Sequence, residues 1–581
     1  MTISFGYTRD ARAVFFLRRA LVAALLLIMA TAMLAQAPRA WTAPSGAIPV
    51  IVRELPGARA AAEQAVTAAG GTIGRRLDII NGFAAEIPAQ AVPSLERSPA
   101  IQSISSNRTI HMLGNSSSTI DPAVMESYLQ SMFVITAMTG AQNMWRAGYT
   151  GRGVDVAIID SGVVPLSEFE GRLVNGPDLS FESQVESLRH LDTFGHGTHL
   201  AGIIAGKEPG LTTFDAKTWK LPTVFLGMAP DARIVNVKVG ARSGATDVSQ
   251  VIAAIDWVVQ HRNADGLNIR VLNLSFGTDG VQSYRVDPLA YAAEVAWRKG
   301  IVVVAAAGNS GFGTSKLNNP AYDPYVIAVG ASDFNGTFEF DNDIVSSFSS
   351  KGDSARRVDI VAPGRSIRSL RDIGSFVDEN YPAGRVDNRL TRGSGTSQAA
   401  AIVSGGAALL IQERPGLTPD EVKALLTRSA YWLPAADPIA QGRGFMNLWA
   451  AHTSAKNILA ASDIVQTWPV STGEGTIDGA RGSSKVAEAD AVLSGEQDAR
   501  GVVWDGTKWA ADAWAEASWS GDTWEGNTWT GNTWTGNTWS GNTWSGNTWT
   551  GNTWTGNTWT GNTWAGNTWS SASWSAFFGE P

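Results

Sequence analysis

The sequence VAIIDSGV, residues 156–163, ends an apolar run on the carboxylate of Asp160 and decides how this chain folds. Two later segments complete a set of three: GHGTHLAGIIAG, residues 195–206, around His196, and GSGTSQAAA, residues 393–401, around Ser397. A serine hydroxyl becomes a good nucleophile when an imidazole takes its proton, and a carboxylate fixes the tautomer of that imidazole. The three segments therefore predict nucleophilic catalysis by Ser397, with His196 as base and Asp160 as its partner.

Strand-like apolar runs alternate with helical patterns around these segments. The alternation predicts an α/β fold with a doubly wound, mainly parallel sheet and helices on both faces. Ligand sites in such sheets lie beyond the carboxyl ends of the strands, where Asp160 and Asn309 fall. His196 and Ser397 instead stand at the start of helical runs. The expected strands are residues 154–159, 234–239, 269–274, 301–306 and 325–329, and the helices include residues 197–206, 247–260, 287–298 and 398–412.

The chain order Asp, His, Ser is one of three unrelated orders in which this triad recurs. A fourth segment, VVVAAAGNSG at residues 302–311, follows in the expected place. Together the four segments resemble the subtilisin-like serine proteases, the subtilase family. The resemblance implies a serine endopeptidase that hydrolyses peptide bonds through an acyl-enzyme. It also implies that the Asn309 side chain donates to the oxyanion, an interaction whose loss typically costs about 10²–10³ in turnover in this same family.

The resemblance extends to the substrate side of the site. LNLSFG, residues 272–277, resembles the edge at which an extended peptide adds as a strand, so Ser275, Phe276 and Gly277 are the expected substrate-binding residues. Two residues depart from the family pattern. Gln398 and Ala401 stand where the family most often has Met and Pro. These departures leave open the packing behind Ser397 and the shape of the first substrate pocket.

Three of the six histidines, His190, His196 and His199, lie close together in the sequence. The segment lacks the Glu and the i,i+4 spacing of a zinc-protease helix, so we expect no catalytic metal. His199 is expected to pack beneath the helix that follows His196. Calcium sites are common in subtilisin-like enzymes, but no acidic loop here has a readable ligand spacing. No cofactor is therefore certain, and calcium remains open.

The N-terminal residues 1–37 predict a secretory signal peptide and hence a secreted location, extracellular or at the cell surface. Four arginines precede an apolar run at residues 20–35, which ends in Ala-Gln-Ala. The run is shorter than the ~20 residues of a spanning helix, although an uncleaved anchor is the alternative. The absence of cysteine excludes a disulfide scaffold.

Residues 48–113 show strand, helix, strand, strand, helix, strand character. This order and the string NGFAAEIP, residues 81–88, resemble the inhibitory propeptide of subtilisin-like proteases, a small α+β ferredoxin-like domain. The enzyme's own propeptide would then be a partner, beside its protein or peptide substrates. A small α+β domain with an unrelated binding role is the alternative. The catalytic domain is expected to span residues 142–459.

The C-terminal part changes composition twice. Residues 462–501 are polar and small, which predicts a linker. Tryptophan then recurs every five residues from Trp504 to Trp574, which defines a repeat tail at residues 502–575. Period five suits neither a straight strand nor a simple helix, whereas a coil with one unit per turn would stack the rings on one face. The tail could bind polysaccharide or a cell surface, associate with itself, or remain a sticky extended segment.

The net charge of −8, with no basic stripe, argues against a nucleic-acid partner. The rival to a protease is a surface-binding or adhesive protein, in which the Trp repeat is the function and the protease block is a degenerate scaffold. The intact set of Asp160, His196, Ser397 and Asn309 argues against this rival.

Overall fold

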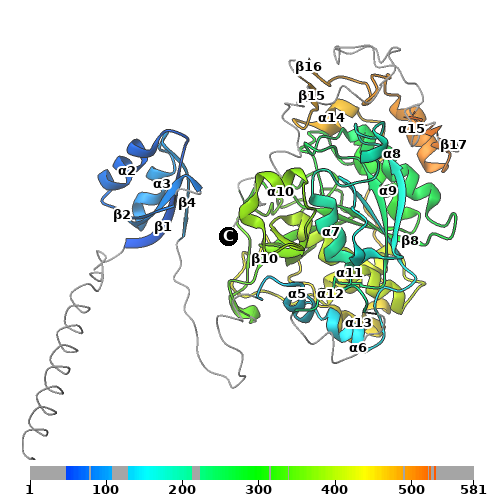
Figure 1. The fold of residues 1–581 in the computed structure, drawn as a ribbon, viewed down its shortest axis with the longest axis horizontal. Coiled ribbons are helices and arrows are strands. Elements are labelled where there is room, and N and C mark those ends of the chain that lie inside the picture. Colours follow the sequence, from blue (N-terminus) through cyan, green and yellow to red (C-terminus); the bar gives the residue numbers. More distant parts are fainter. Residues whose placement is uncertain are drawn as a thin grey trace, which may run out of the picture. The chain divides into compact units, whose positions relative to one another are not determined.

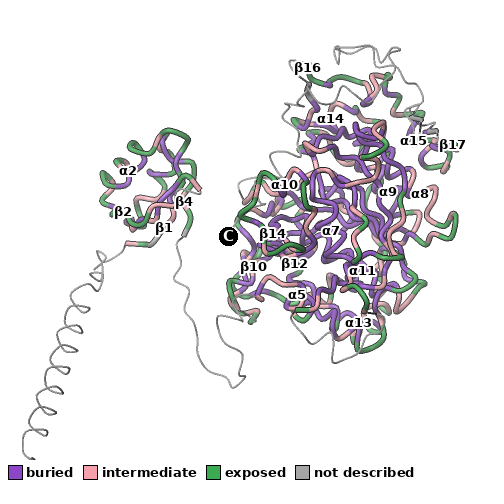
Figure 2. Tube along the Cα trace, in the orientation of Figure 1, coloured by how far each residue is buried: buried purple, intermediate pink, exposed green. Residues whose placement is uncertain are grey.

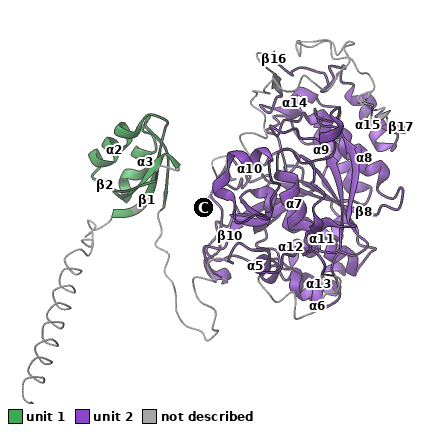
Figure 3. Cartoon of the chain, viewed as in Figure 1, with its two compact units in different colours: residues 1–117 green, residues 118–581 purple. Residues whose placement is uncertain are grey.

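The chain forms two compact units, residues 1–117 and 118–581 (Figure 3). The predicted signal peptide, residues 1–37, and the tail beyond residue 530 lie outside the described residues. Within the described ranges, no helix is both long and apolar enough to cross a membrane. The computed structural model describes residues 47–77, 80–106, 128–211, 223–312, 316–337, 339–488, 491–520, 523–524, 526 and 529–530.

The first unit has the element order βαββαβ that the sequence predicts for residues 48–113. Its sheet has the order β2-β3-β1-β4, and every neighbouring pair is antiparallel. Phe83, Ala85 and Ile87 alternate along β3 and are buried in the unit's own core. The elements are β1 Ala47–Glu54, α2 Arg59–Ala68, β2 Thr72–Leu77, β3 Gly82–Pro88, the 3₁₀ turn Ala89–Ala91, α3 Val92–Leu95 and β4 Ile101–Ser106.

The second unit is built on a mixed, mostly parallel sheet with the strand order β11-β10-β9-β8-β5-β7-β6. All neighbours are parallel except the short edge strand β11, and β12 also pairs in parallel with β10. The strands are β5 Asp155–Asp160, β6 Leu173–Asp178, β7 Arg233–Lys238, β8 Ile269–Leu274, β9 Val302–Ala306, β10 Ile327–Asp333, β11 Ile344–Val345 and β12 Ile360–Pro363. Four of the five expected strands match within one residue at each end. The fifth, expected at 325–329, extends to Asp333.

Two pairs of helices cover this sheet (Figure 1). Helices α7, His196–Ala205, and α11, Thr396–Glu413, pack against each other and the sheet, as do α8, Val248–His261, and α9, Pro288–Arg298. Sixteen of the 18 residues of α11 are buried, so this helix runs through the core instead of along the surface (Figure 2).

The remaining elements complete the second unit. Helix α5 contributes Met132 and Ile135 to the main core, so the folded unit begins before the expected boundary at residue 142. The helices are α5 Met132–Met138, α6 Ala141–Arg146, α10 Phe376–Asn380, α12 Pro419–Arg428, α13 Leu448–Leu459, α14 Ile477–Arg481 and α15 Gly506–Trp514. Short strands are β13 Ile367–Leu370, β14 Leu390–Gly393, β15 Ala487–Glu488, β16 Ala491–Val492, β17 Trp519–Ser520, β18 Thr523–Trp524 and β19 Trp529–Thr530. 3₁₀ turns are Ser167–Phe169, Glu186–Leu188, Phe340–Asn342 and Pro382–Gly384.

The predicted linker at residues 462–501 is wrong, because this segment packs onto α8 and α9. The side chain of Arg481 is fully buried, and its Nε donates to Asp247 Oδ2 at 2.6 Å. Ile477 is buried in the same core as the sheet. Small polar residues had indicated a linker, but here they form hydrogen bonds with the folded core. The backbone N–H of Ser471 donates to Glu294 Oε2 at 2.8 Å.

The start of the predicted repeat tail is also part of this folded unit. The indole N–H groups of Trp509 and Trp524 both donate to Asp256 Oδ2 on α8, at 2.9 and 2.7 Å. Strands β17, β18 and β19 form an antiparallel meander in which Trp519 lies opposite Trp524, and Trp524 opposite Trp529. Over these units the five-residue period is therefore one short strand per unit, not the expected coil.

Removal of the C-terminal extension, residues 460–530, should destabilise the second unit. A chain that ends at Leu459 lacks Arg481, which pairs with Asp247, and the buried side chains of Ile477, Trp509 and Trp524. Burying one large apolar side chain contributes about 1.5–3 kcal/mol, so we expect the free energy of unfolding to fall by several kcal/mol, measured with urea. A chain that ends at Thr530 keeps these contacts and is the matched control, with wild-type stability expected. Equal stability of both truncations would contradict the assignment.

Asp256 should make stability depend on pH. Burial raises its pKa to about 7, whereas the pKa of an unfolded aspartate is about 4. Between these two pH values the unfolded chain loses a proton that the folded chain keeps. The contribution of Asp256 to the free energy of unfolding therefore falls as the pH rises from about 4 to 7. Asp256→Asn keeps an oxygen acceptor for the indoles and cannot ionise.

We expect thermal melts to show Asp256→Asn no more stable than wild type near pH 4 and more stable, by a few kcal/mol at most, near pH 8. Asp265→Asn is the control, because Asp265 lies in an exposed loop. Its effect on the melting temperature should be the same at both pH values. A pH-independent effect of Asp256→Asn would contradict the argument.

Candidate active site

Asp160 is the last residue of β5, which lies between β7 and β8 in the sheet. The side chain is buried, with 1% of its surface exposed. The backbone N–H of Ser161 donates to its Oδ1 at 2.8 Å. The carboxylate is thus fixed at the carboxyl end of a central parallel strand, where the sequence analysis placed it.

His196 is the first residue of α7 and faces Asp160. Its Nδ1 lies 2.9 Å from Asp160 Oδ1 and 3.1 Å from Oδ2. Because Nδ1 faces a carboxylate, the neutral ring carries its proton there, and Nε2 has the lone pair that can accept a proton. Gly197 permits this approach of helix to strand, since a methyl group at its Cα would lie 2.1 Å from the carbonyl oxygen of Gly162.

Asp192, which the sequence analysis missed, holds the start of α7 in place. Its buried carboxylate accepts hydrogen bonds from Gly195 N at 2.6 Å, Thr198 N at 2.7 Å and Ser161 Oγ at 2.7 Å. Burial raises the pKa of Asp192 although these three donors oppose the shift. The available signal was an acidic residue just before a helix N-terminus, where free N–H groups favour a carboxylate.

Ser397 is the second residue of α11 and lies in its first turn, at the helix N-terminus as expected. Its Oγ donates to the carbonyl oxygen of Ser275 at 2.8 Å, and Ser275 Oγ donates in return to the carbonyl of Ser397 at 3.2 Å. Asn273 Nδ2 donates to Ser275 Oγ at 2.7 Å, and Ser404 Oγ to Asn273 Oδ1 at 2.9 Å. This buried network, which the sequence did not reveal, ties the helix to the end of β8.

Asn309 follows β9 and is oriented by the residue before Ser397. Its Oδ1 accepts hydrogen bonds from the backbone N–H of Thr396 at 2.8 Å and from Thr396 Oγ1 at 3.0 Å. A backbone N–H can only donate, so the oxygen end of the amide must face Thr396. The Nδ2 donor therefore points away from Thr396, on a half-buried side chain.

The strand register brings these groups together at the carboxyl ends of the parallel strands, which form one edge of the sheet. Ile158 of β5 pairs with Asn273 of β8, so Asp160 and Ser275, two residues further along, leave the sheet at the same level. Strand β9 is the next neighbour, with Ala305 opposite Leu274. Helices α7 and α11, whose first turns carry His196 and Ser397, pack against each other.

The predicted substrate-binding residues are less open than expected, and the side chain of Ser275 is fully buried. Phe276 is buried, with 3% of its surface exposed. A methyl group at Gly277 would lie 2.6 Å from Asn318 Cβ, so only glycine fits there. Thr278 and Asn319 exchange backbone hydrogen bonds just beyond. Of the three predicted substrate-binding residues, Ser275 is the one in hydrogen-bond contact with Ser397.

The three neighbouring histidines do not form one site. His199 is fully buried, and its Nε2 lies 3.2 Å from the carbonyl of Ile367. Burial, with His196 as a smaller cause, lowers the pKa of His199 to about 3, so this ring stays neutral. Among the described residues, no three His, Cys, Asp or Glu side chains gather as metal ligands.

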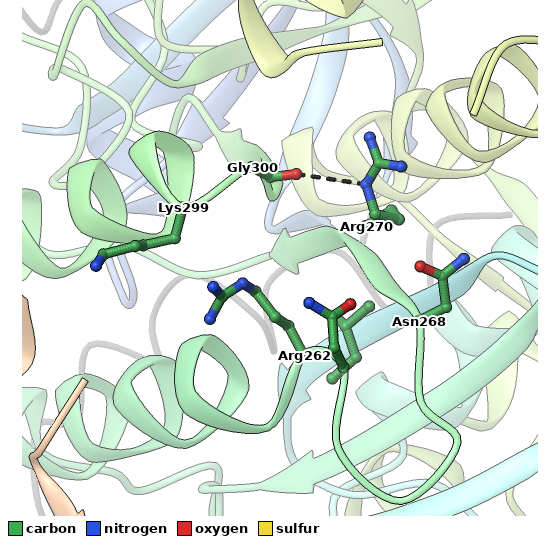
Figure 4. A pocket seen from close by; sticks show the side chains of 7 residues that line it. Arg262, Asn268, Arg270, Lys299 and Gly300 are labelled. Carbon is green, nitrogen blue, oxygen red and sulfur yellow. Dashed lines mark hydrogen bonds between the residues drawn. The ribbon is translucent and has the colours of Figure 1, made fainter. Parts of the chain in front are cut away.

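A cavity of about 280 Å³ lies near the start of β8 and the end of α9, at the opposite end of the strands from Asp160 (Figure 4). Three cationic side chains, Arg262, Arg270 and Lys299, line it. Arg262 and Lys299 both pair with Glu516 of the C-terminal extension. Two of the side chains that line the cavity therefore anchor the extension. None of the nucleophile, base or oxyanion residues predicted from the sequence lines it.

Comparison with known proteins identifies the family. The model of the Subtilase family matches residues 151–467, which include Asp160, His196, Asn309 and Ser397. Serine protease AprX of Bacillus subtilis (strain 168) is 33% identical over 379 residues, 64% of this chain and 79% of the relative. Subtilisin E of the same organism is 29% identical over 389 residues, which cover 66% of this chain and 83% of that relative.

A solved structure of a cold-adapted subtilisin-like serine proteinase is 32% identical, with a TM-score of 0.38, and covers 52% of this chain and 88% of that one. The family match spans more than half of the chain and contains the Asp160–His196 pair at the edge of the parallel sheet. The chain belongs to the subtilase family and is a serine endopeptidase.

Proposed function

We propose that this chain hydrolyses peptide bonds of proteins through an acyl-enzyme formed on Ser397, with Asp160 and His196 as the acid–base pair. The observation that carries the proposal is the buried hydrogen bond of 2.9 Å between His196 Nδ1 and Asp160 Oδ1. In a water-poor environment this carboxylate stabilises the imidazolium that forms when His196 takes a proton.

The reaction then follows from the roles of these groups. Ser397 Oγ attacks the carbonyl carbon as its proton moves to His196 Nε2, which leaves a negative oxygen on a tetrahedral carbon. His196 returns the proton to the amine as the C–N bond breaks, and a water molecule repeats the sequence to release the acid. Asn309 Nδ2 would donate to the negative oxygen, because Thr396 already occupies the other end of its amide.

The network around Ser275 supports the positioning of the nucleophile. In the free enzyme the Ser397 hydroxyl is tied to the Ser275 carbonyl and must turn from it to attack. An extended peptide would add along Ser275, Phe276 and Gly277 as an extra strand. The side chains of Ser275 and Phe276 are both buried and would support the strand from below, whereas the partly exposed Gly277 would lie nearest the substrate.

We further propose that the first unit is an inhibitory propeptide and that residues 1–37 direct secretion to the cell exterior or surface. The βαββαβ order and separate core of the first unit support the first proposal. Calcium stays a proposal that no described cluster of ligands supports. The adhesive alternative also remains a proposal, because residues 531–575 lie outside the described part of the tail.

Loss of the Ser397 hydroxyl should abolish both self-processing and turnover. The chain without residues 1–37 is expressed beside its Ser397→Ala variant, and each is incubated with a fluorophosphonate probe and with casein. We expect the wild type to take up the probe, cleave casein and shorten itself in or after the Ser/Asn-rich stretch at residues 114–119, and the variant to do none of these. Equal casein cleavage by both proteins would overturn the proposal.

A further inference from the structure

Gln398, directly after Ser397 in α11, has a buried side chain that no hydrogen bond explains. Only 1% of its surface is exposed. Neither its Oε1 nor its Nε2 has a hydrogen-bond partner among the residues that the structure describes. Buried amides are normally paired, because an unpaired polar group loses its hydration without compensation.

The amide of Gln398 faces the same place as the amide of Asn309. A methyl group built on Gly395 would lie 2.8 Å from Gln398 Oε1 and 3.3 Å from Asn309 Nδ2. Two side-chain amides therefore flank one point beside the backbone, two residues before Ser397. Rotation about the terminal bond of Gln398 exchanges its oxygen and nitrogen, so its Nε2 can face this point as well.

An apolar residue would fit this position without the cost of an unpaired amide. The next residues of the helix, Ala399, Ala400 and Ala401, are small, apolar and buried. A side chain that lowers the stability of the free enzyme is typical of a group whose partner arrives with the substrate. With Nε2 turned to this point, the amide can pair with an acceptor close to Asn309 Nδ2, which describes the oxygen that becomes negative during attack.

We propose that Gln398 is a further catalytic residue, whose Nε2 donates a hydrogen bond to the scissile carbonyl oxygen beside Asn309. The inference rests on the proposed function, in which Ser397 attacks that carbonyl. Two side-chain amides, and not one, then stabilise the oxyanion in this enzyme.

Gln398→Met tests the proposal, since methionine has the same length and no donor. A hydrogen bond to a charged oxygen that forms only in the transition state should appear in kcat more than in KM. We expect kcat/KM for a peptide substrate to fall about 10- to 100-fold, with the melting temperature unchanged or higher. A kcat/KM within about twofold of wild type would overturn the proposal.

Gln412→Met is the matched control at the far end of the same helix. Gln412 Oε1 accepts hydrogen bonds from the backbone of Thr150 and Gly151, so its role is structural. This variant should melt at a lower temperature and keep the wild-type kcat/KM. The two variants thus separate a catalytic effect from a loss of stability.

A double-mutant cycle with Asn309→Ala identifies the atom that Gln398 contacts. If both amides donate to one oxygen, the losses in kcat are not additive. Fully additive losses would overturn the proposal, because Gln398 would then act on a different atom. Failure of the proposed function is a separate result, seen as wild-type activity that does not depend on Ser397.

Discussion

The parallel register of β5, β8 and β9 is the constraint on which the site depends. Each strand ends at the same edge of the sheet, so residues more than 100 positions apart in the sequence, such as Asp160 and Ser275, leave it side by side. Helix α11 packs against β8, β9 and β10 in the core and carries Ser397 in its first turn. The geometry of the proposed catalytic site is therefore a property of the whole sheet, and a shift of one strand would separate the groups.

Buried polar groups hold the helices α7 and α11, which carry His196 and Ser397, in this arrangement. Asp192 fixes the start of α7, while Asn273 and Ser275 tie α11 to β8. Buried carboxylates likewise hold the C-terminal extension against α8. Asp247 accepts a hydrogen bond from Arg481, and Asp256 accepts hydrogen bonds from two indole N–H groups. The first tryptophans of the repeat are thus structural parts of the second unit.

The sequence predicted much of this because its signals are local. Apolar strands that end in Asp160 or lead to Asn309 can be recognised within about ten residues, as can the glycine-rich starts of α7 and α11. Asp192 and Asn273 escaped, because their roles depend on partners elsewhere in the chain. Gln398 stood out only as a departure from the family pattern, since its burial cannot be read from the sequence. The linker assignment failed for the same reason: small polar residues indicate a linker only when no distant surface receives them, and here Asp247 and Glu294 do.

The most direct test of the account is a crystal structure of the wild-type second unit with a peptide boronic acid. We predict a covalent bond from boron to Ser397 Oγ, with His196 still bonded to Asp160. One boronate oxygen should lie about 2.7–3.1 Å from Asn309 Nδ2. A boronate bound to another residue, or an adduct on Ser397 with both oxygens turned away from Asn309, would contradict the account.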